Sequence, residues 1–283
     1  MFTIAIVNRK GGCGKSTLAT HLAAHFARQG AAVMLGDVDR QQSSRQWLRL
    51  RAQHPPRKVP PIASWVADPQ HVLRPPPDAS HVVLDTPGGL RGLELARVAL
   101  AADVVLLPLS ASLFDRDATL QCLAELRGLP RVAQGRCRLG AVGLRLHPQT
   151  AEAETLQAFA DQAGLPLLGQ LREHPAYQRC LERGLTLFDM SASPVRLTDL
   201  PQWAPVTAQL EVWRQACEAE RRAERPLRAL PARAPRPGSE GPASRLDPLE
   251  SPPPPLGNVP ALQRVLGILP ELLSLRFSSR RGR

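Results

Sequence analysis

Residues 10–17, Lys-Gly-Gly-Cys-Gly-Lys-Ser-Thr, constrain the fold of this chain more than any other stretch. The apolar run Phe2–Val7 before them is typical of a buried strand, and a helix is predicted from Ser16 to about Gln29. A glycine-rich loop between a strand and a helix suits a phosphate, because backbone N–H groups and the helix N-terminus converge on an anion. We therefore expect a phosphate site formed by Gly11, Gly12, Cys13, Gly14, Lys15, Ser16 and Thr17.

Two lysines in this loop indicate a special form of the phosphate site. The chain has 36 Lys+Arg, but only Lys10, Lys15 and Lys58 are lysines. Arg9 stands where the common motif G-x-x-x-x-G-K-[ST] has its first glycine, and Lys10 follows, which is the mark of the deviant Walker A loop. Lysine and arginine are not interchangeable at a phosphate. Lys15 is expected to contact the outer phosphates and the Ser16 hydroxyl to bind Mg²⁺.

Carboxylates follow two later apolar runs. The run 32–36 leads into Asp37 and Asp39, and Val82-Val83-Leu84 leads into Asp85 and the loop Thr86-Pro87-Gly88-Gly89. Ligands of open α/β sheets bind at the carboxyl ends of strands, so these aspartates should face the phosphate loop. One carboxylate can support the metal while another orients the attacking water, and the loop after Asp85 resembles a switch loop near the γ-phosphate.

The rest of the body alternates between predicted strands and helices. Strands are expected near 59–67, 103–108, 138–146 and 166–171, and helices over 43–53, 90–101, 119–126, 150–163, 174–183 and 205–220. Ser43 or Ser44 is a plausible N-cap. The pattern predicts an α/β fold of the P-loop NTPase type, with a mostly parallel twisted sheet and helices on both faces, over residues 1–220.

The end of the chain differs in composition from the body. Residues 221–283 hold 12 arginines against 5 acidic residues, and 12 of the 29 prolines. We expect 221–260 to be a disordered Pro/Arg-rich linker. Residues 261–283 form an amphipathic basic tail, for which a membrane surface, a partner protein and no function remain three open alternatives.

The composition indicates in which cellular compartment the protein is expected. No run of 18 apolar residues predicts a membrane-spanning helix, and the amino terminus lacks the basic region of a signal peptide. The five cysteines are scattered and odd in number, which favours a reducing cytosol without a disulfide framework or a zinc site.

These motifs resemble those of the ParA/MinD family of deviant-Walker ATPases, and most of all its small ParA-type members. The resemblance covers roughly residues 1–215 and includes residues 8–17, 37–41, 82–87, 106–109 and 184–189. It implies an ATP and Mg²⁺ site in which Lys10 reaches the nucleotide of the partner subunit. It also implies that Lys15 binds phosphates, Asp39 orients the hydrolytic water, and Ser16, Asp37 and Asp85 support the metal.

The resemblance implies a slow, partner-stimulated ATPase that cycles between an ATP-bound homodimer and a released ADP form. Such proteins partition or position plasmids, chromosomes or protein cargo in the cytoplasm, in association with the nucleoid, and are activated by a ParB-like protein or a cargo adaptor. Slow turnover also follows from a P-loop site that lacks an arginine finger in cis. Arg172, Arg179 and Arg183 are the candidate contacts to nonspecific DNA.

Three alternative functions would place different demands on the sequence. A MinD-like regulator that cycles on the membrane would use the tail as a peripheral anchor. A reductase resembling the nitrogenase iron protein would need a cysteine pair such as Cys122 and Cys137, and a tyrosine kinase is disfavoured by the single tyrosine, Tyr177. The chain departs from the family at Arg40, usually Pro, and at Leu144-Arg145, often an Asn-Arg pair that helps hold the base.

Overall fold

The protein is described by a computed structural model covering residues 1–39, 41–146 and 150–224, all of which belong to one compact unit, Met1–Ala229. The strands are β1 (Phe2–Ile6), β2 (Val33–Asp37), β3 (Ala63–Val66), β4 (His81–Asp85), β5 (Val104–Leu109), β6 (Arg138–Leu146) and β7 (Leu167–Arg172). The helices are α1 (Lys15–Arg28), α2 (Ser43–Arg51), α3 (Gly92–Ala101), α4 (Leu113–Arg127), α5 (Pro130–Ala133), α6 (Ala151–Gln162), α7 (Pro175–Leu181), the 3-10 helix η1 (Leu187–Asp189) and α8 (Pro194–Glu224).

The strands form one seven-stranded sheet in the order β3-β2-β4-β1-β5-β6-β7, and every pair is parallel. This confirms the predicted fold class. Parallel pairing brings the carboxyl ends of neighbouring strands to one edge, where Asp85 of β4 is level with Ile6 of β1 and with Asp37 of β2. The loop after β1 and the acidic ends of β2 and β4 therefore share that edge.

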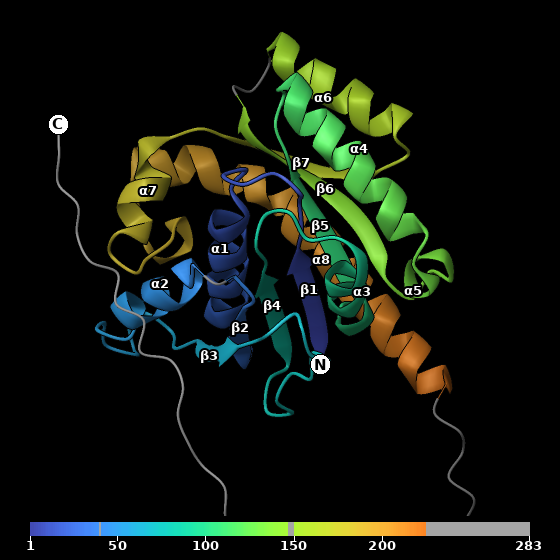
Figure 1. Ribbon diagram of the computed structural model, residues 1–283. Coiled ribbons are helices and arrows are strands. Elements are labelled where there is room, and N and C mark those ends of the chain that lie inside the picture. The colour runs from blue at the N-terminus through green and yellow to red at the C-terminus, as the bar shows by residue number, and fades with distance from the viewer. Residues whose placement is uncertain (40, 147–149, 225–283) are drawn as a thin grey trace, which may run out of the picture. The chain divides into compact units, whose positions relative to one another are not determined.

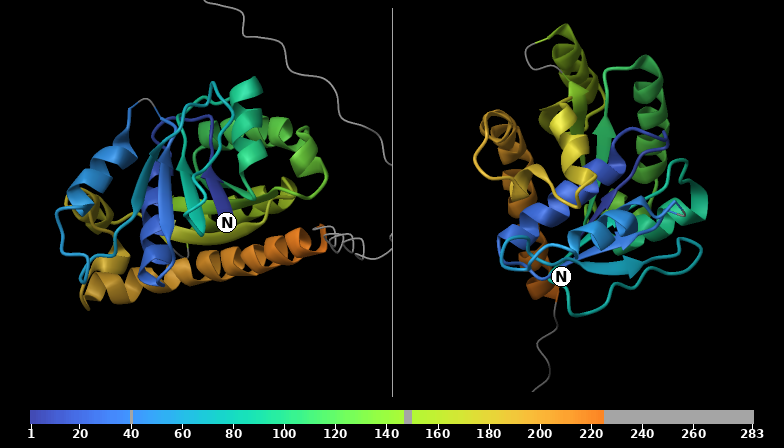
Figure 2. Two further views of the ribbon diagram at one scale, coloured as in Figure 1. Left: turned by 90° about the horizontal axis from the view of Figure 1, so that it is seen from below. Right: turned by 90° about the vertical axis from the view of Figure 1, so that its left-hand side faces the viewer.

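Helices cover both faces of the sheet (Figure 1). One hydrophobic core lies under α1, α2 and α8 and includes Leu22, Trp47 and Trp203. The second core lies under α3, α4 and α6 and includes Leu95 and Leu123. Strands buried on both faces are almost wholly apolar, which explains why their runs stood out in the sequence. Figure 2 shows α8 lying along its face of the sheet for its whole length.

The last helix differs most from its predicted bounds. The helix α8 begins at Pro194, not at Pro205, and continues past Glu220 to Glu224. Pro201 and Pro205 lie inside it, where buried Trp203, Val206 and Leu210 anchor that part of the helix to the core. The helix α4, Leu113–Arg127, contains the segment 119–126 that was predicted to lie in a helix, and the short α5 was not predicted.

The predicted N-cap of α2 is wrong. Gln42 is the capping residue, with a left-handed φ of 53°, and its own side chain makes no capping hydrogen bond, whereas the Asp37 carboxylate accepts the N–H of Arg45 in the first turn. Ser44 lies within the first turn and is fully buried, and its hydroxyl donates to the Asp85 carboxylate.

Residues 221–224, predicted as the start of the disordered linker, belong instead to the last turn of α8. The rest of the predicted Pro/Arg-rich linker 221–260 and the basic tail 261–283 lie outside the described residues, and so does Arg40. Within the described ranges, no helix is long and apolar enough to cross a bilayer.

Candidate nucleotide site

The loop between β1 and α1 wraps around a cavity of about 580 Å³. Its lining includes Gly11, Gly12, Gly14, Lys15, Ser16 and Thr17. Asp39 from the end of β2, Gly88 from the loop after β4 and Arg145 from β6 complete the walls. The structure thus brings together the residues that the sequence assigned to phosphate binding. Cys13 is the exception, because it is buried and its thiol contacts the Lys10 carbonyl at 3.3 Å.

Gly14 shows why this loop needs glycine. It precedes α1 with a φ of 90°, a left-handed conformation that residues with a Cβ rarely adopt. A Cβ at Gly14 would also lie 2.6 Å from Cδ1 of Leu144 on β6. A side chain at this position would therefore require the end of the Leu144 side chain to move.

The ammonium group of Lys15 is held inside the loop. Its Nζ donates to the Lys10 carbonyl at 2.8 Å and lies 3.8 Å from the Cys13 sulfur, and Lys15 is only 7% exposed. A buried ammonium with one carbonyl partner is poorly compensated, so a phosphate oxygen in the adjoining cavity would be a stronger partner.

The Lys10 side chain does not line the phosphate cavity. Its Nζ forms an ion pair with Asp115 in the first turn of α4, on the same subunit. The backbone N–H of Lys10 donates to the Asn8 side chain at 3.1 Å, and Asn8 in turn donates to the Pro108 carbonyl at 2.8 Å. The sequence did not indicate Asp115, which belongs to no phosphate motif, and it gave no role to Asn8 beyond its place in the matched run 8–17.

The two aspartates after β2 differ in their surroundings. Asp37 is buried and accepts the backbone N–H groups of Asp39 and Arg45, both at 3.0 Å. Burial raises the pKa of Asp37 despite these hydrogen bonds. Asp39 lines the phosphate cavity and accepts the N–H of Gln41 at 3.0 Å. Asp37 thus organises the turn, and Asp39 presents its carboxylate to the cavity.

Asp85 has the features of a metal-supporting carboxylate. It is 1% exposed, and burial raises its pKa to about 6 against the opposing effect of hydrogen bonds from the hydroxyls of Ser44 and Ser16. Its Oδ1 is buried without a hydrogen-bond partner among the residues that the structure describes. An unsatisfied carboxylate oxygen beside a serine hydroxyl fits Mg²⁺, a hard cation that takes oxygen ligands and keeps several waters. Ser44 was not predicted to belong to this group.

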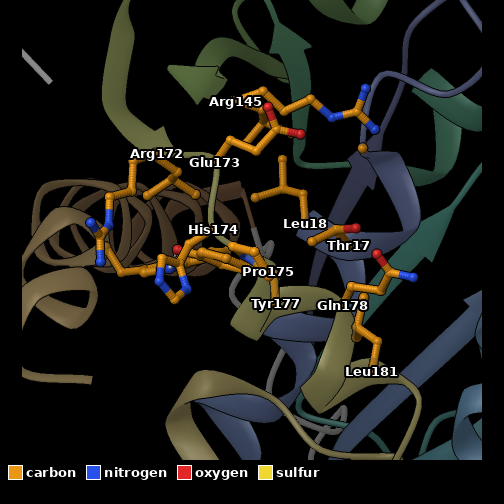
Figure 3. A pocket seen from close by; sticks show the side chains of 14 residues that line it. Thr17, Leu18, Arg145, Arg172, Glu173, His174, Pro175, Tyr177, Gln178 and Leu181 are labelled. Atoms are coloured by element: carbon orange, nitrogen blue, oxygen red, sulfur yellow. Dashed lines mark hydrogen bonds between the residues drawn. The ribbon is translucent and has the colours of Figure 1, made fainter. Parts of the chain in front are cut away.

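A second cavity of about 490 Å³ adjoins the phosphate cavity and shares Gly14, Thr17 and Arg145 with it. Figure 3 shows that Thr17 and Leu18 reach it from α1, and that His174, Pro175, Tyr177, Gln178 and Leu181 reach it from the segment that forms α7. Its mixed apolar and polar lining is suited to a flat heterocycle. The sequence had left the base contacts open. Leu144, which replaces the polar residue of the family pattern, is part of this lining.

Arg145 lies where the two cavities meet. It has a φ of 59°, a left-handed conformation that is unusual for arginine, within the irregular pairing of β6 with β7. Such strain in a side-chain-bearing residue tends to occur at functional sites.

The three arginines predicted to contact DNA differ in their exposure and in the ion pairs that they form. Arg172 donates from Nε to Asp199 of α8, which is fully buried, at 2.5 Å. Arg179 on α7 and Arg183 just after it are exposed. Arg179 and Arg183 therefore remain the stronger candidates, because Arg172 already neutralises a buried charge.

Cys122 and Cys137 are buried in the core beneath α3, α4 and α6. Burial raises the pKa of Cys122 to about 11 and that of Cys137 to about 12, so both remain protonated thiols at neutral pH. Nothing in this placement favours an iron–sulfur cluster between subunits.

The sheet is wholly parallel, a phosphate loop follows β1, and the adjacent strands β2 and β4 end in aspartates. These features together define a P-loop nucleotide-binding protein. The family model described as the CobQ/CobB/MinD/ParA nucleotide binding domain matches residues 4–187, and the chain belongs to this family.

Curated relatives and solved structures agree with this assignment. The chain is 28% identical over 193 residues to the maintenance of carboxysome distribution protein A of Halothiobacillus neapolitanus, covering 68% of this chain and 88% of the relative. It is 34% identical over 215 residues to the chromosome-partitioning ATPase Soj of Thermus thermophilus, covering 63% and 86%. An ATP complex of a Cyanothece McdA variant has the same fold, with a TM-score of 0.57 at 18% identity over 77% of this chain and 96% of that one.

Proposed function

We propose that this protein is a ParA-type ATPase that hydrolyses ATP slowly with Mg²⁺ and cycles between an ATP-bound homodimer and a released ADP form. The observation that carries the proposal is the cavity lined by the phosphate loop with Lys15, Ser16 and Asp39, together with the buried, unsatisfied carboxylate oxygen of Asp85, whose side chain interacts with Ser16. The ATP complex of the similar McdA variant supports adenine as the base.

Different residues of the site would have different roles in hydrolysis. The backbone N–H groups of Gly11–Thr17 and the Lys15 ammonium would hold the phosphates. The Ser16 hydroxyl would ligate Mg²⁺ directly, with Asp85 and Asp37 behind it, and the ion would neutralise charge on the β- and γ-phosphate oxygens. Asp39 would orient the attacking water from the cavity wall.

The biological task proposed is the partition or positioning of DNA or of a protein cargo. The relatives are named for carboxysome distribution and chromosome partitioning, and both tasks place a large object within the cell. Arg179 and Arg183 would contact DNA phosphates without regard to sequence, on a cytoplasmic protein associated with the nucleoid. A ParB-like protein or a cargo adaptor would stimulate hydrolysis.

Dimer formation is supported by the surface beside the loop. Leu113 and Phe114 at the start of α4 are 63% and 76% exposed, next to Asp115 and its partner Lys10. Large apolar side chains at such exposure are typical of surfaces that become covered by a partner.

The lysines give a direct test of this function. Lys15→Ala should lower the affinity for MgATP at least 100-fold in calorimetry, because it removes the charge-assisted contact to the phosphates. Lys10→Ala should bind MgATP as the parent does but remain monomeric in light scattering. Lys58→Ala, which changes the one lysine outside the loop, should resemble the parent in both measurements.

Two results would contradict the proposal. One is a parent protein that binds no MgATP, and the other is a Lys10→Ala variant that dimerises with ATP as well as the parent. The proposed binding to DNA has its own test. Binding to arbitrary duplex DNA should depend on ATP and on salt concentration, and it should weaken in Arg179→Ala and Arg183→Ala.

A further inference from the structure

The cavity assigned to the base has walls that come from three helices. Thr17 reaches it from α1 and Tyr177 from α7, as Figure 3 shows, and Trp203 of α8 completes the lining on the side of Tyr177. A flat heterocycle fits between such walls only if they stay at a fixed spacing. The side chains that pack behind the walls therefore decide how well the cavity is prepared for a base.

His21 packs behind these walls. It lies on α1 four residues after Thr17, is fully buried and does not itself line the cavity. Its imidazole ring is stacked on the Trp203 ring, with centroids 5.2 Å apart and 11° between the planes, and its centroid lies 5.1 Å from that of Tyr177. The Trp203 Nε1–H donates to the Tyr177 hydroxyl at 3.1 Å. One imidazole ring thus connects α1, α7 and α8.

Hydrogen bonds at both nitrogens fix the plane of the His21 ring. Nε2 accepts the backbone N–H of Leu187 at 3.4 Å, so the proton of the neutral ring is on Nδ1. Nδ1 then donates to the Thr17 carbonyl at 2.8 Å. Burial lowers the pKa of His21 to about 4, which keeps the ring neutral at neutral pH. The ring cannot turn without losing one of these bonds.

We propose that His21 is a positioning residue for the nucleobase, because its ring holds Tyr177 and Trp203 at a fixed spacing from Thr17. This inference rests on the proposed function, since it concerns the cavity assigned to the base. Without the ring, the Tyr177 and Trp203 side chains would gain rotational freedom. A bound base would have to remove that freedom again, so the affinity for the base would fall.

The groups that bind phosphate are held by other contacts. Lys15 Nζ donates to the Lys10 carbonyl at 2.8 Å. The Thr17 carbonyl, which accepts the His21 N–H, also accepts the Thr20 hydroxyl at 3.1 Å and keeps that partner when His21 is changed. A change at His21 should therefore weaken binding of the base and spare binding of the phosphates.

Two histidines of α1 give a matched pair of variants. His21→Gln removes the ring behind the cavity. His25→Gln makes the same change one turn later, where the ring packs against Phe26 and Phe188 and does not line the cavity. Each variant is compared with the parent by calorimetry with MgADP and with magnesium pyrophosphate, which has the same phosphates without the base. The ADP form is used because, in the proposed cycle, it binds without forming the dimer.

The expected result is a loss confined to one ligand and one variant. His21→Gln should raise the Kd of MgADP about ten-fold or more and leave the Kd of magnesium pyrophosphate within about two-fold of the parental value. His25→Gln should match the parent with both ligands. A purely structural role of His21 would weaken binding of both ligands alike.

A second measurement uses the parent protein alone. Proton–nitrogen spectra report the tautomer and the charge of each of the seven histidine rings, and His21 is assigned through its backbone signals. His21 should be neutral at neutral pH with its proton on Nδ1. Its ring signals should shift when MgADP is added and stay in place when magnesium pyrophosphate is added.

The outcomes separate the two proposals. A parent protein that binds neither ligand contradicts the proposed function. A parent that binds MgADP more tightly than magnesium pyrophosphate, but whose His21 signals do not respond to MgADP, contradicts the positioning role alone. A His21→Gln variant that loses affinity for both ligands equally, or for neither, also contradicts that role.

Discussion

At the scale of single residues, the nucleotide site depends on backbone conformations that only glycine adopts easily. Gly14 combines a left-handed φ with a close approach to Leu144, a residue that also lines the cavity assigned to the base. A side chain here would disturb the loop and the base cavity at once.

Gly14→Ala should therefore destabilise the protein by more than the left-handed conformation alone, which costs about 1–2 kcal/mol. Gly30→Ala is the matched control, because Gly30 has a φ of 85° and open space around it. Denaturant titrations should show a larger loss for Gly14→Ala, and calorimetry should show weaker MgATP binding for that variant alone. Equal losses in both measurements would contradict this reading of the contact with Leu144.

At the scale of elements, α2 connects the Asp85 carboxylate, which we propose to support the metal, to the segment after α7. Its first turn contributes the Ser44 hydroxyl to Asp85. Further along, Trp47 Nε1 donates to the Leu185 carbonyl at 3.2 Å, and Arg51 donates to both Asp189 oxygens at 2.8 and 3.1 Å. Both partners of this last pair are almost completely buried.

Arg51→Met should cost about 3 kcal/mol of unfolding free energy, because it leaves the buried Asp189 carboxylate with only the ion pair to Arg28 at 3.5 Å and the hydrogen bonds of Thr186. Burial pushes the pKa of Asp189 up, but hydrogen bonds and charge from Arg51 outweigh it and hold the pKa below its usual value. This stabilisation is present above the unfolded pKa of about 4 and is lost as pH falls through the lower folded value.

Arg49→Met, an exposed arginine on the same helix, provides the control and should change stability by less than about 0.5 kcal/mol. Urea unfolding at neutral pH measures both variants. Similar midpoints for the two would show that the pair with Asp189 contributes little.

At the scale of the whole molecule, the sequence predicts the sheet and the phosphate loop well, because buried parallel strands are continuous apolar runs and the loop is a local motif. The ion pair of Lys10 with Asp115 and the hydrogen bond of Ser44 to Asp85 could not be predicted, since they join residues 105 and 41 positions apart that only the strand order brings together. The start of α8 was not predicted, because Pro201 and Pro205 argue locally against a helix. The packing of this part of the helix against the core cannot be read from the local sequence pattern.

Acid stability is a property of the whole fold, and several histidines contribute to it: burial lowers the pKa of His25 to about 4 and also lowers that of His81. His21 is fully buried, and burial lowers its pKa to about 4, while its ring accepts the Leu187 N–H at 3.4 Å and bonds the Thr17 carbonyl at 2.8 Å. The unfolded chain binds a proton at this histidine near pH 6.5, so stability falls as pH drops from there towards 4.

Between pH 7.5 and pH 5 the His21 contribution amounts to about 2 kcal/mol of lost unfolding free energy. Asp85, whose pKa burial raises to about 6, acts in the opposite direction over part of this range, so the parent is compared with His21→Gln. Urea unfolding at both pH values should show the smaller loss for the variant. Equal losses would mean that His21 does not set the acid sensitivity.

The loop that follows β4 touches the phosphate loop with no side chain between them. A Cβ on Gly88 would lie 3.1 Å from the backbone nitrogen of Gly11, so the two chains are in contact main chain to main chain. Side chains can rotate to absorb a small displacement, but two peptide planes in contact cannot. A displacement of the backbone at Gly11 is therefore expected to displace the loop after β4 as well, so that the two loops would move together.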